Sequence, residues 1–210
     1  MVYSLASEAV DERDLRQLLE EIYQERSLSF FCSGQNIPMG DRDIWVVYRG
    51  VVQLNILYPS GEEGLLGLAA DYMPFGLPLT AIDAYYATAL SDVDLMRLTV
   101  SEVDQSPTLA HSIWRQLNRR LRQTEAMLAL VGHQRVKDRL VHLLLLLKEE
   151  IGQPVSEGTR LNVKLTHQHL ANAIGTTRVT VTRILGELRQ EGWLNIDWQL
   201  HIIIRPSMRG

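Results

Sequence analysis

The segment THQHLANAIGTTRVTVTRIL, residues 166–185, constrains the fold most, because two short apolar patterns meet in it at a single glycine. Gly175 permits the positive φ of a tight turn between two helices. Thr176 or Thr177 can cap the second helix, since a threonine oxygen accepts its free backbone N–H groups. The spacing predicts a helix-turn-helix, whose second helix would enter the DNA major groove. The apolar residues expected between the two helices are Leu170, Ala171, Ile174, Val181, Ile184 and Leu185.

The second of these helices would turn a polar face outward. Arginine pairs bidentately with guanine, and threonine hydroxyls suit phosphate oxygens. A purely structural helix pair, which is the alternative, would more often interleave Glu and Lys there. After Gly192, the stretch WLNIDWQLHIIIRP alternates around a polar turn and predicts a β-hairpin, which completes a winged helix-turn-helix. The expected outward residues are Thr177, Arg178, Thr180, Thr182 and Arg183.

The charge distribution favours the same part of the chain. The net charge is −4, but residues 133–210 carry +4 and the preceding residues carry −8. A basic C-terminal third on an acidic body predicts a polyanionic partner for that third alone. Chance clustering of surface charge is the alternative.

Several classes of protein are disfavoured. The single cysteine, Cys32, excludes an intramolecular disulfide and an all-cysteine metal site within one chain. No apolar run approaches the roughly 20 residues of a membrane span, and the acidic N-terminus lacks the order of a signal peptide, so we expect a cytoplasmic protein. His167 and His169 would point apart on a helix. Because HExxH, a phosphate-binding glycine loop and a nucleophile elbow are all missing, we expect no enzyme, no catalytic residues and no metal site.

The rest of the chain divides into segments with different predicted secondary structure. Residues 1–28 predict a helix, and residues 30–98 contain short β-type runs separated by turn residues, which favour a β-roll or barrel. Residues 136–151 predict an amphipathic helix, and residues 152–160 a polar loop.

A long helix is predicted to begin at Ser106 and Pro107, a good capping residue followed by a proline tolerated in the first turn. Its apolar residues recur at alternating steps of four and three, the heptad pattern by which two helices form a coiled coil. We therefore expect a dimer, the alternative being that this stripe packs on its own β domain. Gly132 and His133 are a candidate hinge. The stripe comprises Ala110, Trp114, Leu117, Leu121, Thr124, Leu128 and Val131.

In this order and at this length, the predicted β-roll, long helix and winged helix resemble the CRP/FNR family of bacterial transcription regulators. Within that family, the segments LTHQHLANAIGTTRVTVTRILGELR, RRLRQTEAML and FGLPL are similar to its nitrogen-control (NtcA-type) branch. The resemblance implies an α+β fold with an N-terminal double-stranded β-helix, which is a cyclic-nucleotide-binding-like β-roll. It places the sensor domain with its N-terminal helix at residues 1–105, the dimerisation helix at 106–132 and the winged helix-turn-helix at 133–210.

The resemblance also implies a homodimer on a near-palindromic DNA site, with RNA polymerase as a further partner. An acidic residue found in cyclic-AMP receptors after the first arginine is missing here, which favours a GTA…TAC type of site. By position, Arg178 and Arg183 would contact bases, and Val179 would line the groove. The full set expected at DNA is Thr166, His167, Thr176, Thr177, Arg178, Val179, Thr180, Thr182 and Arg183. The set expected at the dimer interface is Trp114, Leu117, Leu121, Thr124 and Leu128.

An effector would bind in the β-roll. Cyclic AMP is disfavoured, because the glutamate and the arginine–serine pair that the family uses for it are missing from FGLPLTAIDAYYATAL. For 2-oxoglutarate the match is incomplete, since the arginine expected before the strand falls at Ala84. Another effector, or none, remains the alternative, and in the latter case the β-roll would serve protein contacts. Haem is disfavoured, because its available ligands are isolated histidines on helices. The residues that match an effector site are Phe75, Gly76, Leu77, Pro78, Arg120 and Glu125.

Overall fold

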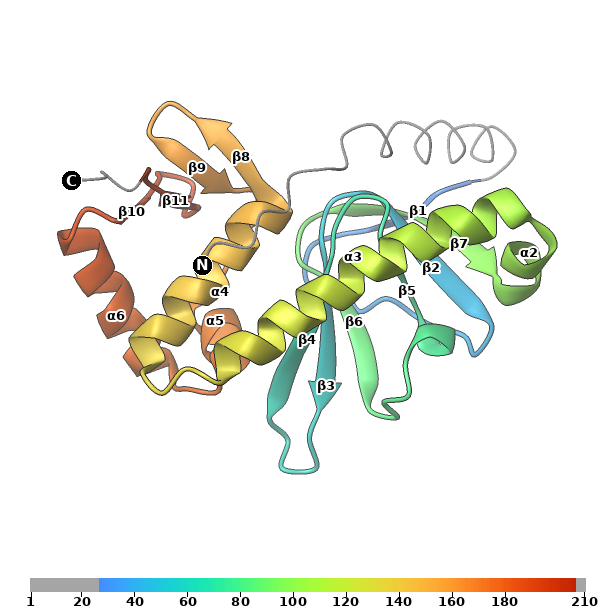
Figure 1. Ribbon diagram of the computed structural model, residues 1–210, viewed down its shortest axis with the longest axis horizontal. Helices are drawn as coiled ribbons and strands as arrows, with labels where there is room; N and C mark the ends of the chain where they lie inside the picture. The colour runs from blue at the N-terminus through green and yellow to red at the C-terminus, as the bar shows by residue number, and fades with distance from the viewer. Residues whose placement is uncertain (1–26, 207–210) are drawn as a thin grey trace.

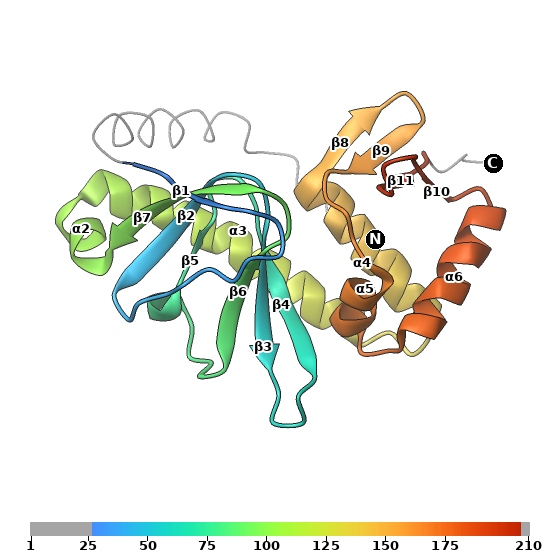
Figure 2. The same ribbon diagram turned by 180° about the vertical axis from the view of Figure 1, so that it is seen from behind.

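The computed structural model describes residues 27–206, so all but the last two residues of the helix predicted for residues 1–28 lie outside the described range. The long helix α3 (Pro107–Val131) crosses the molecule. On one side of it lies a roll of β-strands, and at its C-terminal end lies a lobe of three helices and four short strands (Figures 1 and 2).

Two antiparallel sheets form the roll. One has the order β1 (Ser29–Phe31), β7 (Val93–Thr99), β2 (Asp43–Arg49) and β5 (Pro74–Phe75). The other has the order β4 (Glu63–Ala69), β3 (Val52–Leu57) and β6 (Tyr85–Ala89), and a 3-10 turn, η1 (Leu77–Leu79), follows β5. Alternate side chains on each strand face inward, where they form one apolar core. The short strands expected within residues 30–98 are therefore present, and they form a β-roll.

The roll leads into α2 (Val100–Gln105). A capping box between Thr99 and Glu102 stabilises the start of this helix. Ser106 then caps α3 through a bond of 3.3 Å from the Leu109 N–H, and Pro107 is its first residue, as the sequence predicts. The face of α3 bearing Leu109 and Ile113 packs on the first sheet.

The predicted heptad stripe lies on a different face of α3. The side chains of Trp114, Leu121 and Leu128 are 62%, 57% and 76% exposed, so the alternative that they pack on their own β-roll is wrong. Leu117 is half-buried and also contacts the cluster beneath the helix.

The C-terminal lobe contains α4 (Val136–Ile151), α5 (His167–Ile174) and α6 (Arg178–Gln190). Its sheet has the order β10 (Leu194–Ile196), β11 (Ile202–Ile204), β9 (Gly158–Leu161) and β8 (Gly152–Val155). The predicted hairpin after Gly192 is formed by β10 and β11. The prediction of a polar loop at residues 152–160 was wrong, because these residues form the β8–β9 hairpin. The hairpin looks like a loop in sequence because β8 is a short, exposed edge strand that contains a glycine and a proline and has no alternating apolar pattern.

The lobe and the roll share one apolar cluster. Leu68 of β4, Met127 of α3 and Leu143 of α4 belong to it, and they line a small cavity at this junction. None of the helices within residues 27–206 is long and apolar enough to cross a membrane.

Candidate nucleic-acid interface and effector site

Side-chain caps begin both helices of the helix-turn-helix, and the sequence predicts the cap of the second one. Thr166 caps α5 by accepting the His169 N–H at 3.1 Å. Gly175 ends α5 in the left-handed region, at φ 62°. Of the two candidate caps for α6, Thr177 performs the role by accepting the Thr180 N–H at 3.2 Å. Ala171 lies fully buried in the angle between the helices, where a methyl group lets them approach closely.

One face of α6 is presented to solvent. Arg178 lies exposed in its first turn, and Val179 is 78% exposed. Arg183 is also exposed, and its guanidinium forms an ion pair with Glu187 one turn later. This ion pair neutralises part of the charge that Arg183 would bring to DNA. Thr180 and Thr176 are half-buried beside the turn.

The first helix touches this face through a relay of hydrogen bonds. The Thr182 hydroxyl donates to the Arg178 carbonyl oxygen at 2.9 Å, which commits its single proton. His167 Nδ1 lies 2.7 Å from the same hydroxyl oxygen and must therefore be the donor. The remaining nitrogen, Nε2, carries the lone pair of the neutral ring, so it can donate to a phosphate only when the ring is charged.

His169 lies on the side of α5 that faces the β-roll. It packs toward β4, where burial lowers its pKa and the carboxylate of Glu63 partly opposes that shift. Its Nδ1 accepts the Thr166 N–H at 3.4 Å. The ring therefore belongs to the contact that seats the helix-turn-helix against the roll.

The predicted effector residues only partly converge. Phe75 is fully buried, and Gly76 has φ 145°, where a Cβ would lie 2.3 Å from the Asp43 carbonyl oxygen. Arg120 reaches this turn from α3, and its Nη1 donates to the Pro74 carbonyl oxygen at 3.4 Å. Leu77 and Pro78 continue the turn in η1.

Sequence reasoning missed Tyr85, whose hydroxyl is buried beside Arg120 and Gly76. Burial raises the pKa of Tyr85, while the Arg120 guanidinium and the Gly76 backbone oppose the rise. The hydroxyl nevertheless lies outside good hydrogen-bond geometry with both. Only its position on an inward-facing site of β6, next to the predicted turn, could have indicated this role.

Glu125 and Ala84 do not join this group. Glu125 is exposed, and five residues of helix turn it by about 140° from Arg120. Ala84 is exposed in the turn that precedes β6, outside the buried group formed by Phe75, Tyr85 and Arg120.

At the junction between the β-roll and the C-terminal lobe, α3 forms polar contacts with both. The Gln123 Oε1 accepts the Leu68 N–H of β4 at 2.8 Å, and Arg119 pairs with Glu150 of α4 at 3.2 Å. Gln123 Nε2 is buried next to the Glu150 carboxylate without good hydrogen-bond geometry.

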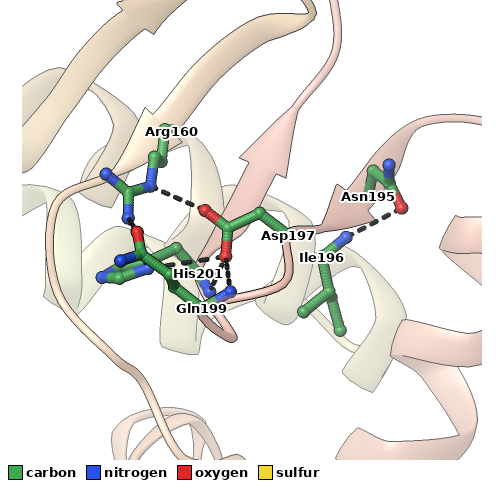
Figure 3. Close-up of polar contacts among 6 residues, drawn as sticks. All are labelled: Arg160, Asn195, Ile196, Asp197, Gln199 and His201. Atoms are coloured by element: carbon green, nitrogen blue, oxygen red, sulfur yellow. Dashed lines mark hydrogen bonds and ion pairs between the residues drawn. The ribbon is translucent and has the colours of Figure 1, made fainter.

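A second polar cluster lies at the polar turn predicted within the β10–β11 hairpin (Figure 3). The Asp197 carboxylate accepts bonds from the Gln199 and His201 N–H groups at 2.9 and 2.8 Å, and from Arg160 Nε of β9 at 2.8 Å. Burial tends to raise the pKa of Asp197, but these donors lower it overall. Burial, and then Arg160, lower the pKa of His201.

Comparison with known proteins shows which family has this architecture. Residues 138–207 match a family model described as a Crp-like helix-turn-helix domain. The global nitrogen regulator of Nostoc sp. is 36% identical over 191 residues, which cover 87% of this chain and 84% of that protein. The chain belongs to the CRP/FNR family of transcription regulators.

Other CRP/FNR relatives agree. The global nitrogen regulator of Synechocystis sp. is 35% identical over 82% of this chain and 79% of its own. A solved CRP/FNR-family regulator from Thermus thermophilus superposes with a TM-score of 0.69 at 27% identity, covering 86% of this chain and 94% of that one. A cyclic nucleotide-binding domain containing protein from Listeria monocytogenes reaches 0.76 at 16% identity over 92% and 98%, which shows the fold alone. The predicted fold class and DNA-binding regulator function are therefore confirmed.

Proposed function

We propose that this CRP/FNR regulator acts as a cytoplasmic homodimer on a near-palindromic DNA site, with α6 of each protomer in a major groove. The exposed stripe on α3 supports the dimer: Trp114, Leu121 and Leu128 lie seven residues apart, and such a row of bare apolar side chains requires a partner. A second copy of the same helix supplies the same heptad spacing.

The exposed face of α6 carries the proposal of base contact. Arg178 stands at the end of the helix that enters the groove first, and it can pair with guanine O6 and N7. Val179 offers an apolar side chain to a thymine methyl group. Thr166 and Thr176 supply hydroxyl donors at the N-terminal ends of the two helices, where phosphate is favoured, and His167 adds a donor when its ring is charged.

The proposed division of labour follows the elements. The residues before Ser106 form the effector-sensing domain. Helix α3 forms the dimer interface, and the lobe after Gly132 binds DNA. We expect RNA polymerase as a further partner, and no catalytic activity.

The proposal of an effector site in the β-roll rests on the positively charged Arg120 beside the turn at Phe75 and Gly76. Arg120 is half-buried beside Phe75 and Gly76, next to the unsatisfied Tyr85 hydroxyl, so a small anionic ligand could gain two polar contacts. A dianion such as 2-oxoglutarate would need a second cation, and Ala84 does not supply it. The second candidate is a constitutive DNA-binding dimer whose roll contacts protein. The screen that separates them is thermal shift over nucleotides and 2-oxo acids, since a ligand of the folded state raises the melting temperature.

The experiment that tests the function itself is selection from a randomised duplex library with the full chain. Recovery of one inverted repeat, bound by two chains, supports the proposal. Recovery of no preferred sequence would contradict it.

A further inference from the structure

Glu187 places a carboxylate at the edge of the proposed DNA-binding face, one turn after Arg183 on α6. The phosphate backbone of DNA repels such a charge, so an acid here weakens the attraction of α6 to DNA of any sequence. The ordinary explanation is a surface ion pair between residues four apart on a helix, which contributes little to stability. That explanation does not account for the contacts of the second carboxylate oxygen.

Each oxygen of the Glu187 carboxylate faces its own cation. Oε1 accepts a hydrogen bond from Arg183 Nη1, and Oε2 lies 4.0 Å from Lys137 Nζ of α4. Lys137 is in turn paired at 2.6 Å with Glu191, the residue that caps the C-terminal end of α6. Because Lys137 belongs to another helix, it holds Glu187 toward Arg183 whether or not DNA is bound.

This arrangement leaves Arg183 a free edge for a base. A guanidinium carries five N–H donors, so a bond from Nη1 leaves the edge formed by Nε and Nη2 available. Two parallel bonds from one such edge match the O6 and N7 atoms of guanine. Gly186, on the same exposed face, leaves the surface beside Arg183 open, since a Cβ built there meets no atom within 4 Å.

We propose that Glu187 is a positioning residue that determines sequence specificity by directing Arg183 to a base instead of to phosphate. The inference rests on the proposed function, which assigns a base contact to Arg183. On the correct sequence the ion pair persists and the guanidinium is already oriented, so less side-chain freedom is lost on binding. On other sequences Arg183 has only phosphates to contact, and the nearby carboxylate opposes that contact.

The first test titrates the full chain against the GTA…TAC palindrome and a scrambled duplex over a series of salt concentrations. Glu187→Gln should bind the scrambled duplex more tightly than wild type does and the palindrome no more tightly. The ratio of the two affinities should therefore fall about tenfold. On the scrambled duplex, the slope of log affinity against log salt concentration should steepen by about two, because one arginine per protomer becomes free to contact phosphate.

Glu191→Gln is the matched control. It removes the same charge from the same end of α6 and also removes a partner of Lys137, but Glu191 is not bonded to Arg183. This variant should keep the wild-type ratio of affinities. A wild-type ratio for Glu187→Gln, or an equal fall for both variants, would overturn the inference, because the effect would then be absent or due to net charge alone.

The second test uses palindromes in which one base pair of each half-site is replaced. Arg183→Ala should abolish the wild-type penalty at one position, and Glu187→Gln should reduce the penalty at that same position. Adding Glu187→Gln to Arg183→Ala should change the penalty there no further. If Arg183→Ala affects no single position while the palindrome is still preferred, the inference fails alone. A wild-type protein without preference for the palindrome would refute the proposed function itself.

Discussion

Arg119 of α3 and Glu150 of α4 form an ion pair of 3.2 Å in which the two side chains are only 22% and 6% exposed. The pair joins the proposed dimer helix to the first helix of the DNA-binding lobe. Burial raises the pKa of Glu150, and Arg119, Gln123 and Arg122 oppose this only in part. The buried carboxylate therefore costs more in lost hydration than its partners return.

Glu150→Gln should for this reason be more stable than wild type at pH 7. A carboxyl whose folded pKa lies above its ordinary 4.5 contributes stability that is present below 4.5 and is lost as the pH rises through the folded value. A glutamine at position 150 cannot ionise, so the variant does not lose this stability as the pH rises. The difference in melting temperature between Glu150→Gln and wild type should therefore shrink as the pH falls toward 4.5. Thermal unfolding followed by circular dichroism measures it. Glu149→Gln, at the exposed neighbour, is the control. If Glu150→Gln is less stable than wild type at pH 7, the ion pair with Arg119 stabilises the fold by more than the burial of the carboxylate costs.

Leu121→Glu should convert the dimer to monomers. The side chain lies at the centre of the exposed stripe, so the new carboxylate would be buried against its symmetry mate. Sedimentation velocity gives the mass directly. Leu145→Glu, on an exposed apolar residue of α4 outside the stripe, should remain dimeric. Dimers of unchanged mass for Leu121→Glu would refute the coiled-coil assignment.

Gly175→Val should destabilise the protein by about 1–2 kcal/mol, the usual cost of a left-handed backbone for an L-residue. Gly175 has φ 62°, and a Cβ built there meets no atom within 4 Å, so the penalty comes from the backbone rather than from a clash. Gly175→Asn should cost clearly less, because asparagine tolerates this region. Denaturant titration of both variants provides the comparison. Equal losses would mean that the turn depends on something other than φ.

The local patterns in the sequence predicted the C-terminal lobe well. Caps, periodicity and one glycine act between neighbours, so Gly175 and Thr177 indicated the turn that the structure contains. The strands at residues 152–160 were missed for the opposite reason. β9 also pairs with β11, more than forty residues later, whose Ile203 lies opposite Arg160, and only the contact between β8 and β9 is local.

The effector site was harder to predict, since it depends on contacts between elements far apart in the chain. Arg120 was matched by its place on the helix, but its contact with Pro74 spans 46 residues. Glu125 matched the same pattern and lies on another face of α3. Tyr85 carries no signal in a pattern of residue types, because only the folded roll places its hydroxyl beside Arg120.

The most direct test of the account is a titration of wild type and Arg178→Ala against the GTA…TAC palindrome and a scrambled duplex at one salt concentration. Bidentate pairing with guanine discriminates by about 1–3 kcal/mol per contact, and a homodimer makes the contact twice. Arg178→Ala should therefore lose about 2–6 kcal/mol on the palindrome and keep most of its affinity for the scrambled duplex. An equal loss on both duplexes would make Arg178 a phosphate contact and contradict base recognition by α6.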